Sequence, residues 1–212
     1  MAKSKKDIRK PGRPSNPISR SSIVTIARNV FASAGYAGAS LQKIAEKTGL
    51  RKASLYHHFS SKEALYLAVL DTLVEDLSTI FAQALVNEGS FVARLEIAAT
   101  AALNYLADNA DAAQILVREM MDGGPFVEAH GQSAILTALE TGAQFFSLGI
   151  EAGDFREQDP RQLMISVMGL VLHSYAAMGI TNKFLGYELA SKEGRIRRNE
   201  ALSLQIRALC CS

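Results

Sequence analysis

Apolar residues recur every three or four positions along most of the chain, which is the spacing of amphipathic α-helices. In residues 20–34 the apolar positions include Ile23, Ala27 and Val30, and Gly35 follows as a helix stop. The same spacing predicts further helices over 40–48, 52–59, 61–87, 91–107, 111–121, 126–152, 160–181 and 193–209. No segment alternates apolar and polar residues as a half-buried strand does. The sequence therefore predicts an all-α fold.

The short helices near the N-terminus carry local start and stop signals. Ser40 is a suitable N-cap for the second helix, and Gly49 is suited to end it. Ser60 and Glu63 have the spacing of a capping box, which predicts that the fourth helix begins there.

The helices 40–48 and 52–59, joined at a glycine and braced by 20–34, form a helix-turn-helix unit. Leu55 and Phe59 stand four positions apart, so both face inward and the opposite side of this helix faces out. In such a unit the outward side chains of the second helix meet bases and phosphates in the major groove of DNA. The outward residues here are Lys52, Ser54, Tyr56 and His57.

Charge is distributed unevenly between the two parts of the chain. Residues 1–62 hold 13 Lys and Arg against two acidic residues, a net charge of +11. Residues 63–212 hold 10 Lys and Arg against 19 acidic residues, a net charge of −9. This separation indicates a basic module that binds a polyanion, attached to an acidic module with another task.

The adjacent histidines His57 and His58 raise the question of a metal or catalytic site. Neighbouring helical residues project about 100° apart, whereas metal-binding pairs on a helix usually stand four positions apart. The nearby acid, Glu63, is assigned to the helix cap. Contact with DNA is therefore the favoured interpretation of the two imidazoles, and packing or a metal or catalytic role are the alternatives.

The segment AGASLQKIAEKTGLRKASLYHHFSSKEALYLAVL, residues 37–70, carries a family pattern. The pattern includes Gly35-Tyr36 just before this segment and, within it, Ile44-Ala45, Gly49, Leu55-Tyr56, His58-Phe59, Lys62 and Ala64-Leu65. With these residues, 20–70 resembles the DNA-binding region of the TetR (tetracycline repressor) family of bacterial transcriptional regulators. The resemblance implies an N-terminal three-helix DNA-binding domain followed by a helical ligand-binding and dimerisation domain.

The resemblance also implies which residues contact DNA. They are Ser40 and Gln42 on the second helix, Lys52, Ser54, Tyr56, His57 and His58 on the third, and Lys62 at the start of the fourth. Two positions depart from the family pattern: Arg51 stands where a Ser-type cap is common, and Ala53 where Gly is common. The third helix is therefore expected to start less firmly, and Arg51 becomes an additional candidate for a phosphate contact.

Residues 1–18 contain six basic residues and three prolines, a composition that predicts an extended, disordered arm. The motif Gly-Arg-Pro around Arg13 is of the kind that enters a narrow minor groove. The alternative is a solvated tail that strengthens non-specific binding by counterion release.

The acidic part is expected to provide dimerisation. The stretch GIEAGDFREQDP, residues 149–160, is similar to the turn before the last core helices of the family. The helix 160–181 is apolar around most of its circumference and must be covered on two sides. We expect a second copy to cover it together with helix 193–209, which gives a homodimer suited to a palindromic operator. Small residues that permit close approach are Gly169, Ala176, Ala177 and Gly179.

A small-molecule pocket is expected among the fourth to eighth helices. The candidate lining residues are Asn104, Tyr105, Arg118, Met121, His130, Phe145, Met168, His173 and Tyr175. For each of them, ordinary core packing is the alternative. No catalytic set, cofactor motif or metal-ligand pattern is found, so no enzyme activity and no cofactor are expected.

Two features bear on location. The uncharged stretch 163–180 just reaches transmembrane length, but it contains polar residues and stands alone, so a buried helix is favoured over a membrane span. No N-terminal signal sequence is found, and a reducing, cytoplasmic setting is expected. Cys210 and Cys211, adjacent near the C-terminus, are expected to be a frayed pair; a thiol or metalloid sensor is the alternative.

The sequence thus predicts a basic arm (1–18), a helix-turn-helix DNA-binding domain (19–65) and a helical effector-binding and dimerisation domain (66–212). The expected function is a homodimeric repressor that a small, largely apolar effector releases from a palindromic operator on double-stranded DNA. The alternatives are an activator or effector-independent regulator, a sequence-tolerant structural DNA binder, and a helical enzyme that depends on His130 or His173.

Overall fold

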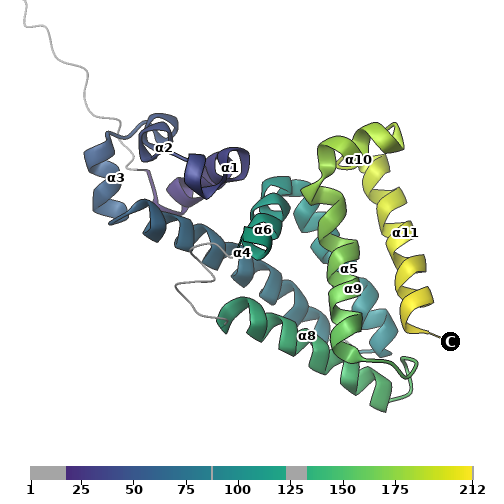
Figure 1. Ribbon diagram of the computed structural model, residues 1–212. Coiled ribbons are helices and arrows are strands. Elements are labelled where there is room, and N and C mark those ends of the chain that lie inside the picture. The colour runs from purple at the N-terminus through teal and green to yellow at the C-terminus, as the bar shows by residue number, and fades with distance from the viewer. Residues whose placement is uncertain (1–17, 87, 123–132, 212) are drawn as a thin grey trace, which may run out of the picture.

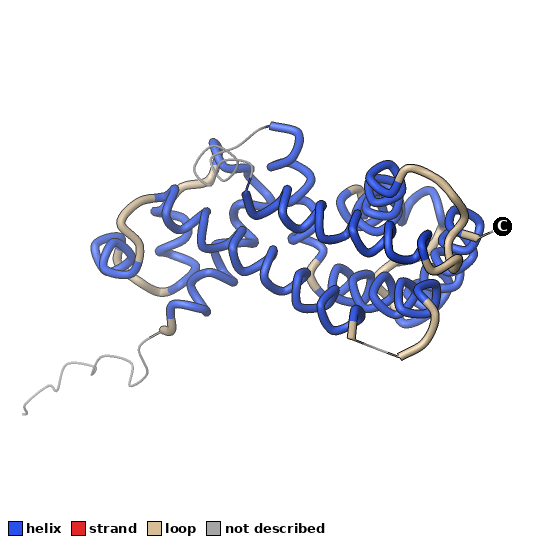
Figure 2. Tube along the Cα trace, turned by 90° about the horizontal axis from the view of Figure 1, so that it is seen from below, coloured by secondary structure: helices blue, strands red, loops and turns tan. Residues whose placement is uncertain are grey.

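The computed structural model describes residues 18–86, 88–122 and 133–211, which form ten α-helices and no strand. The predicted all-α fold is therefore confirmed in these residues. Helices α1 to α3 form a small head at one end of the molecule, and the long helix α4 joins the head to a larger bundle, the body (Figure 1). The view from below shows the same elongated shape, with the head and the body at opposite ends (Figure 2).

The head consists of α1 (Arg20–Gly38), α2 (Leu41–Thr48) and α3 (Lys52–His58). Inside α1, Gly35 leaves helical geometry with φ 69° and ψ 172°, so the regular helix ends where the sequence predicted its stop. A positive φ is open to glycine at little steric cost, which explains this residue at the kink.

The core of the head is assembled from one buried face of each helix. Phe31 of α1, Ile44 of α2 and Leu55 of α3 are each at most 1% exposed. Phe59, just after α3, is buried as well, and the guanidinium of Arg20 lies 4.5 Å from the centre of its ring. The predicted inward direction of Leu55 and Phe59 is therefore confirmed, and it fixes the opposite face of α3 toward solvent.

Helix α4 (Lys62–Leu85) begins one residue later than the predicted start at residue 61. The hydroxyl of Ser61 accepts a hydrogen bond from the backbone N–H of Ala64 at 2.9 Å, so Ser61 is the capping residue. The predicted capping box of Ser60 with Glu63 is wrong, because Ser61, and not Ser60, caps the first turn of the helix.

The body contains α5 (Phe91–Asp108), α6 (Ala110–Asp122), α8 (Ser133–Glu151), α9 (Pro160–Ala176), α10 (Met178–Leu185) and α11 (Lys192–Cys210). Helix α8 matches the described part of the segment predicted over 126–152, and residues 126–132 of that segment lie outside the described residues. Buried side chains of the head and the body form one continuous core.

The single helix predicted over 160–181 is wrong, because α9 and α10 meet at Ala177 with a bend of 84°. The turn back places Leu189 in the core with no exposed surface. The side chain of Asn182 holds the turn by accepting a hydrogen bond from the backbone N–H of Leu189 at 2.9 Å. Tertiary packing here overrides a helical sequence pattern.

Among the described helices, none alone is long and apolar enough to cross a membrane, although α9 and α10 together meet the length and composition across their bend. Cys210 is fully buried at the end of α11, and its carbonyl oxygen accepts a hydrogen bond from the backbone N–H of Arg156 at 2.7 Å. The expected frayed C-terminus is therefore wrong at this residue.

Candidate functional site

The outer face of α3 is the first candidate site. Lys52, Tyr56, His57 and His58 are exposed on it, and Ser54 is half-buried. Tyr56 is a large side chain with 46% of its surface exposed on this face. All five side chains carry groups that can hydrogen-bond to DNA, so the predicted direction of this face is confirmed, although their contacts with DNA stay a prediction.

Helix α3 begins without a side-chain cap. Arg51 occupies the N-cap position, and its side chain makes no capping hydrogen bond. Its carbonyl oxygen accepts from the backbone N–H groups of Ser54 and Leu55 at 2.9 and 3.1 Å, so backbone bonds close the first turn. The exposed guanidinium of Arg51 therefore stays available for a phosphate at the start of the helix.

Helix α2 carries the other candidate contacts. The hydroxyl of Ser40 accepts from the backbone N–H of Lys43 at 3.3 Å, which confirms it as the N-cap. Gln42 is exposed, and its amide donates to the carboxylate of Glu46 at 2.9 Å on the same helix. A DNA contact from Gln42 would therefore replace this bond or share it.

Lys62 begins α4 as expected and makes its contacts within the protein, while its implied DNA contact stays a prediction. Its ammonium donates to the carbonyl oxygens of Ala37 and Ala39 at 3.3 and 3.1 Å, and lies 4.5 Å from the ring centre of Tyr36. Burial, followed by the Glu63 carboxylate, raises the pKa of Tyr36, so the phenol beneath this cation stays neutral. Lys62 ties α4 to the turn between α1 and α2.

Arg13 and the basic arm lie outside the described residues. The described part of the chain contains no group of three or more His, Cys, Asp and Glu side chains that could hold a metal ion.

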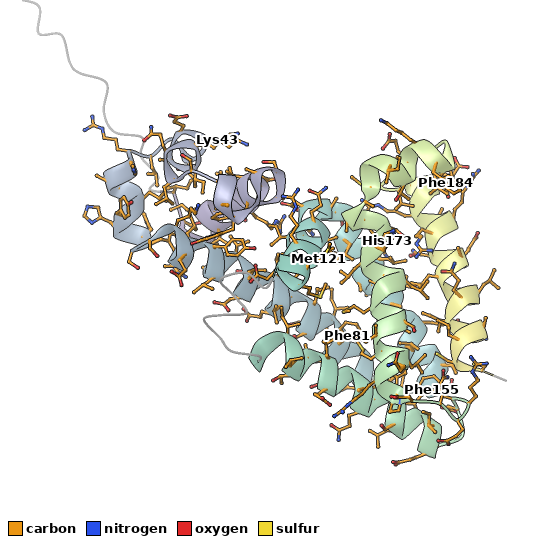
Figure 3. The ribbon with its side chains drawn as sticks, viewed as in Figure 1. Lys43, Phe81, Met121, Phe155, His173 and Phe184 are labelled. Carbon is orange, nitrogen blue, oxygen red and sulfur yellow. The ribbon has the colours of Figure 1, made fainter. Side chains whose placement is uncertain are left out.

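The second candidate site is a cavity of about 660 Å³ in the body, enclosed by α4, α5, α6, α8 and α9. Its wall includes Phe81 of α4, which Figure 3 labels, together with Leu116 of α6 and Phe145 of α8. Ala98 and Ala102 of α5, two small residues one turn apart, leave part of the space open. The volume lies within the range of pockets that enclose drug-sized ligands.

Of the nine residues predicted to line a pocket, Phe145 and Met168 do so. Asn104 faces α11, where it accepts from the side chain of Asn199 at 3.5 Å, and Tyr105 donates to Asp76 at 2.7 Å. Arg118 donates to the carbonyl oxygen of Ala32 in the head. These three side chains serve contacts between helices, so the prediction that they line the cavity is not supported.

The remaining predicted pocket residues also lie elsewhere. Met121 is 78% exposed, and His173 is exposed on α9 (Figure 3). Tyr175 is buried in the core outside the lining of the cavity, and burial raises its pKa. His130 lies outside the described residues. Arg94, a lining residue, was missed, because an arginine near a helix start gives no sequence signal of an inward direction.

Comparisons with known proteins find a family match in the head and relatives along most of the chain. Residues 23–69 match the bacterial regulatory proteins of the tetR family. The chain is 24% identical over 168 residues to the HTH-type transcriptional regulator RutR of Escherichia coli (strain K12), with 78% of this chain and 79% of RutR covered. It is 31% identical over 134 residues to the HTH-type transcriptional activator FasR of Mycolicibacterium smegmatis, covering 63% of this chain and 60% of FasR.

The helix-turn-helix in the head is a DNA-binding domain of the TetR family. Together with the relatives along most of the chain, this supports a DNA-binding transcriptional regulator. The fold agrees with a solved structure of AibR in complex with isovaleryl coenzyme A and operator DNA, at a TM-score of 0.71 and 18% identity over 90% of this chain and 97% of that one.

Polar contacts join the two candidate sites of this chain through α6. Arg28 of α1 donates to the carboxylate of Asp111 at 2.8 Å and to the side-chain oxygen of Asn109 at 2.7 Å. The side chains of Arg28 and Asp111 are only 14% and 16% exposed, so water screens this pair weakly. Arg118 adds a hydrogen bond of 3.0 Å to the carbonyl oxygen of Ala32.

The same helix is tied to α4. The phenol of Tyr66 donates to the carboxylate of Glu119 at 2.7 Å, and both side chains are buried. Because Leu116 and Met120 of α6 line the cavity, one short helix faces the cavity, α1 and α4. A shift of α6 at the cavity would therefore act directly on the TetR-type head.

The outer surface of α9 and α11 is the third feature of interest. These helices lie side by side at one edge of the body (Figure 1). Ile165 of α9 exposes 50% of its surface, and Ile196 and Leu204 of α11 expose 51% and 70%. A Cβ atom added at Gly169 would meet no other atom, so the face of α9 is open at this point. Exposed apolar groups of this kind often mark interaction surfaces.

Proposed function

We propose that this chain is a homodimeric repressor that a small, largely apolar effector releases from a palindromic operator. The observation that carries the proposal is the position of α4, whose residues Val74, Leu77 and Phe81 line the cavity and whose first residue, Lys62, is bonded to the head. One continuous helix thus connects the cavity to the DNA-binding head, and a ligand-responsive regulator needs a connection between these two sites.

In the proposed complex, α3 enters the major groove and presents Lys52, Tyr56, His57 and His58 to bases and phosphates. Ser40, Gln42, Arg51 and Ser54 add contacts at the edges of the groove. The first 62 residues supply a net charge of +11 for non-specific attraction to the phosphate backbone. The arm, with Arg13, either enters the minor groove or adds only to this general attraction.

The proposed dimer forms through α9 and α11, whose exposed isoleucines and leucine would be covered by the same helices of a second copy. A two-fold dimer places two recognition helices about one helical turn of DNA apart, roughly 34 Å, which matches a palindromic site. This arrangement supplies the affinity that one short helix lacks.

The proposed release follows from a difference in effector affinity between two states. In the DNA-binding state α6 holds the head through Arg28 and Arg118, and it is tied to α4 through Tyr66. An effector that fits the cavity better when α4 has pivoted shifts the population away from this state, and the spacing of the two recognition helices is lost. The size of the response is limited by that difference in affinity.

The solved complex of AibR names both a coenzyme A thioester and operator DNA, which supports a ligand-responsive regulator built on this fold. FasR is named as a transcriptional activator, which supports the alternative that the DNA-bound dimer promotes transcription. In either case the chain would act at the chromosome, in the bacterial cytoplasm.

The test is selection of bound sites from random duplexes by the purified full chain. We expect a two-fold symmetric motif that is bound about 1000-fold or more tightly than unrelated DNA. Binding that depends on salt but not on sequence would contradict the proposal and favour a structural DNA binder. Transcription in vitro from a promoter that carries the selected motif separates repression from activation.

A further inference from the structure

We propose that the effector is an uncharged amphipath, with an aliphatic body inside the cavity and one neutral hydrogen-bonding end, such as a hydroxyl, at a mouth between α4 and α8. This inference rests on the proposed function, because it assigns the chemistry of the ligand at the site where the effector would bind.

The deep wall of the cavity accepts an apolar body. Every buried residue in the described lining is apolar, and examples are Ala98 and Ala102 of α5, Phe146 of α8, and Met164 and Val167 of α9. None of these side chains offers a hydrogen-bonding group to a ligand, apart from the weak thioether of the methionine. A polar group placed here would lose its water without compensation, whereas an aliphatic chain loses no hydrogen bond.

The mouth of the cavity carries hydroxyl groups. The exposed lining residues include Ser78 and Ala82 of α4 and Thr137, Ala138 and Thr141 of α8, so the cavity opens toward solvent between these two helices. A ligand that enters here can keep its polar end at the mouth while its body lies inside, which is the arrangement of an amphipath.

The hydroxyls of the mouth match a ligand end that both donates and accepts. The hydroxyl of Thr141 donates to the carbonyl oxygen of Thr137 at 2.8 Å, so toward a ligand it can only accept. The hydroxyls of Ser78 and Thr137 make no hydrogen bond to another described residue, so each of them can donate or accept. An alcohol can donate to Thr141 and accept from either of the other two.

The cavity supplies no counter-charge to a charged ligand. Its described lining contains no Asp or Glu side chain, so an ammonium group would enter without a partner. The charged side chain of that lining is Arg94, whose guanidinium carbon lies 4.6 Å from the ring centre of Phe91 and 5.5 Å from that of Phe145. Arg94 is thus already engaged within the protein, and its charge is not counted toward a ligand. Burial of an uncompensated charge costs far more than burial of a hydroxyl.

The surface beside the mouth also disfavours an anionic end. Asp71 and Glu75 stand seven and three positions before Ser78, a spacing that places all three on one side of α4, and both carboxylates are exposed. An anion held just outside the mouth would be repelled by them, to an extent that salt reduces. A neutral end avoids both this repulsion and the cost of burying a charge.

The test measures direct binding to the DNA-free full-length protein by calorimetry at pH 7.5, with decanol, decanoate and decylamine as probes. The three probes share one alkyl chain and carry a neutral, a negative and a positive end at this pH. We expect decanol to bind about ten-fold more tightly, or better, than either charged probe. Equal or tighter binding of a charged probe, or no binding of decanol, overturns the inference.

The Thr141→Val variant removes the acceptor at the mouth and keeps the shape of the side chain. It should weaken binding of decanol about three- to ten-fold, as expected for the loss of one hydrogen bond, and leave that of decyl methyl ether, which cannot donate, unchanged. Thr72→Val is the matched control, because the Thr72 hydroxyl likewise donates to a carbonyl oxygen one turn earlier, that of Ala68 at 2.9 Å, but lies outside the cavity lining. The control should change neither affinity. No loss for decanol in Thr141→Val, or an equal loss for both probes, overturns the inference.

The Ala102→Leu variant narrows the cavity from α5 and should weaken decanol binding about five-fold or more, while circular dichroism shows an unchanged helical content. Unchanged decanol binding by this folded variant would place the binding site outside the cavity and overturn the inference. Operator release is titrated separately. If decanol binds with the expected dependence on Thr141 and leaves operator affinity unchanged, the ligand assignment stands and the release mechanism of the proposed function fails.

Discussion

The ammonium of Lys62, the first residue of α4, donates a hydrogen bond to the carbonyl oxygen of Ala39 at 3.1 Å. The same ammonium bonds the carbonyl oxygen of Ala37, so it satisfies acceptors left free where α1 ends and α2 begins. Lys62 therefore sets the angle at which the recognition unit sits on α4. This role differs from the DNA contact that the sequence resemblance implied.

The Lys62→Met variant distinguishes these two roles. Loss of the charged hydrogen bonds should lower the free energy of unfolding by about 1.5–3 kcal/mol and weaken operator binding. The slope of log affinity against log salt concentration should stay unchanged. A slope smaller by about 1 would instead identify Lys62 as a phosphate contact. Lys52→Met, which removes an exposed lysine of α3, is the control that should show the reduced slope with unchanged stability.

The Tyr56→Ala variant tests the recognition face. Because Tyr56 is 46% exposed, its removal should lower the free energy of unfolding by no more than about 1 kcal/mol. Operator affinity should fall by roughly ten-fold or more if the side chain contacts a base, as judged from a loss of 1–3 kcal/mol per specific contact. Fluorescence anisotropy with the selected operator measures this loss, and unchanged affinity would exclude Tyr56 from the interface.

The ion pair between Arg28 and Asp111 is expected to carry the signal from α6 to α1. The Arg28→Met variant should keep effector affinity on DNA-free protein but reduce the effector-induced change in operator affinity. A double-mutant cycle with Asp111→Asn should give a coupling energy of about 0.5–3 kcal/mol in stability. The exposed pair Arg161–Glu140, between α9 and α8 at 3.0 Å, is the matched control and should leave regulation unchanged.

The proposed dimer surface is tested by charge substitution. Ile165→Glu and Leu204→Glu place carboxylates on the exposed faces of α9 and α11 and should convert the protein to monomers in sedimentation experiments. Leu148→Glu is the control, because Leu148 has a similar exposure of 47% but lies on α8. If Leu148→Glu alone produced monomers, the second copy would cover α8 instead.

Burial raises the pKa of the Cys210 thiol to about 11, with a smaller effect of Cys211. At pH 8 this lowers the fraction of reactive thiolate about 100-fold relative to an ordinary cysteine. Iodoacetamide should therefore modify Cys210 only after unfolding. Because the folded state holds the proton more tightly, the associated stability is present below about pH 9 and is lost as the pH rises toward 11. A Cys210→Ala variant should lack this part of the alkaline loss.

The head could be predicted closely because its signals are local. Ser40, Gly49 and the pair Leu55 and Phe59 each fix a feature within one or two helical turns. Even here the cap of α4 was misplaced by one residue, since Ser60 and Ser61 are equally suitable caps and tertiary packing chooses between them. The local sequence therefore does not determine which of the two serines caps the helix.

The body was less predictable because its features depend on contacts between distant residues. Ala177 carries no signal for a break, and the bend there accompanies the burial of Leu189 twelve positions later. The cavity depends on how five helices pack, so Asn104 and Arg118 could not be separated from true lining residues such as Arg94. Polarity alone did not indicate which way these side chains point.

The continuity of α4 limits how this regulator can be recombined with others. A chimera that joins its head to a foreign sensor at residue 65 would cut through the helix, remove Tyr66 and discard the partners of Arg28. Such a hybrid would bind its operator without responding, unless the grafted half brought its own acceptors opposite α1. The operator specificity is therefore changed most simply by substitutions at the exposed positions of α3. These substitutions keep every contact between the head and the body.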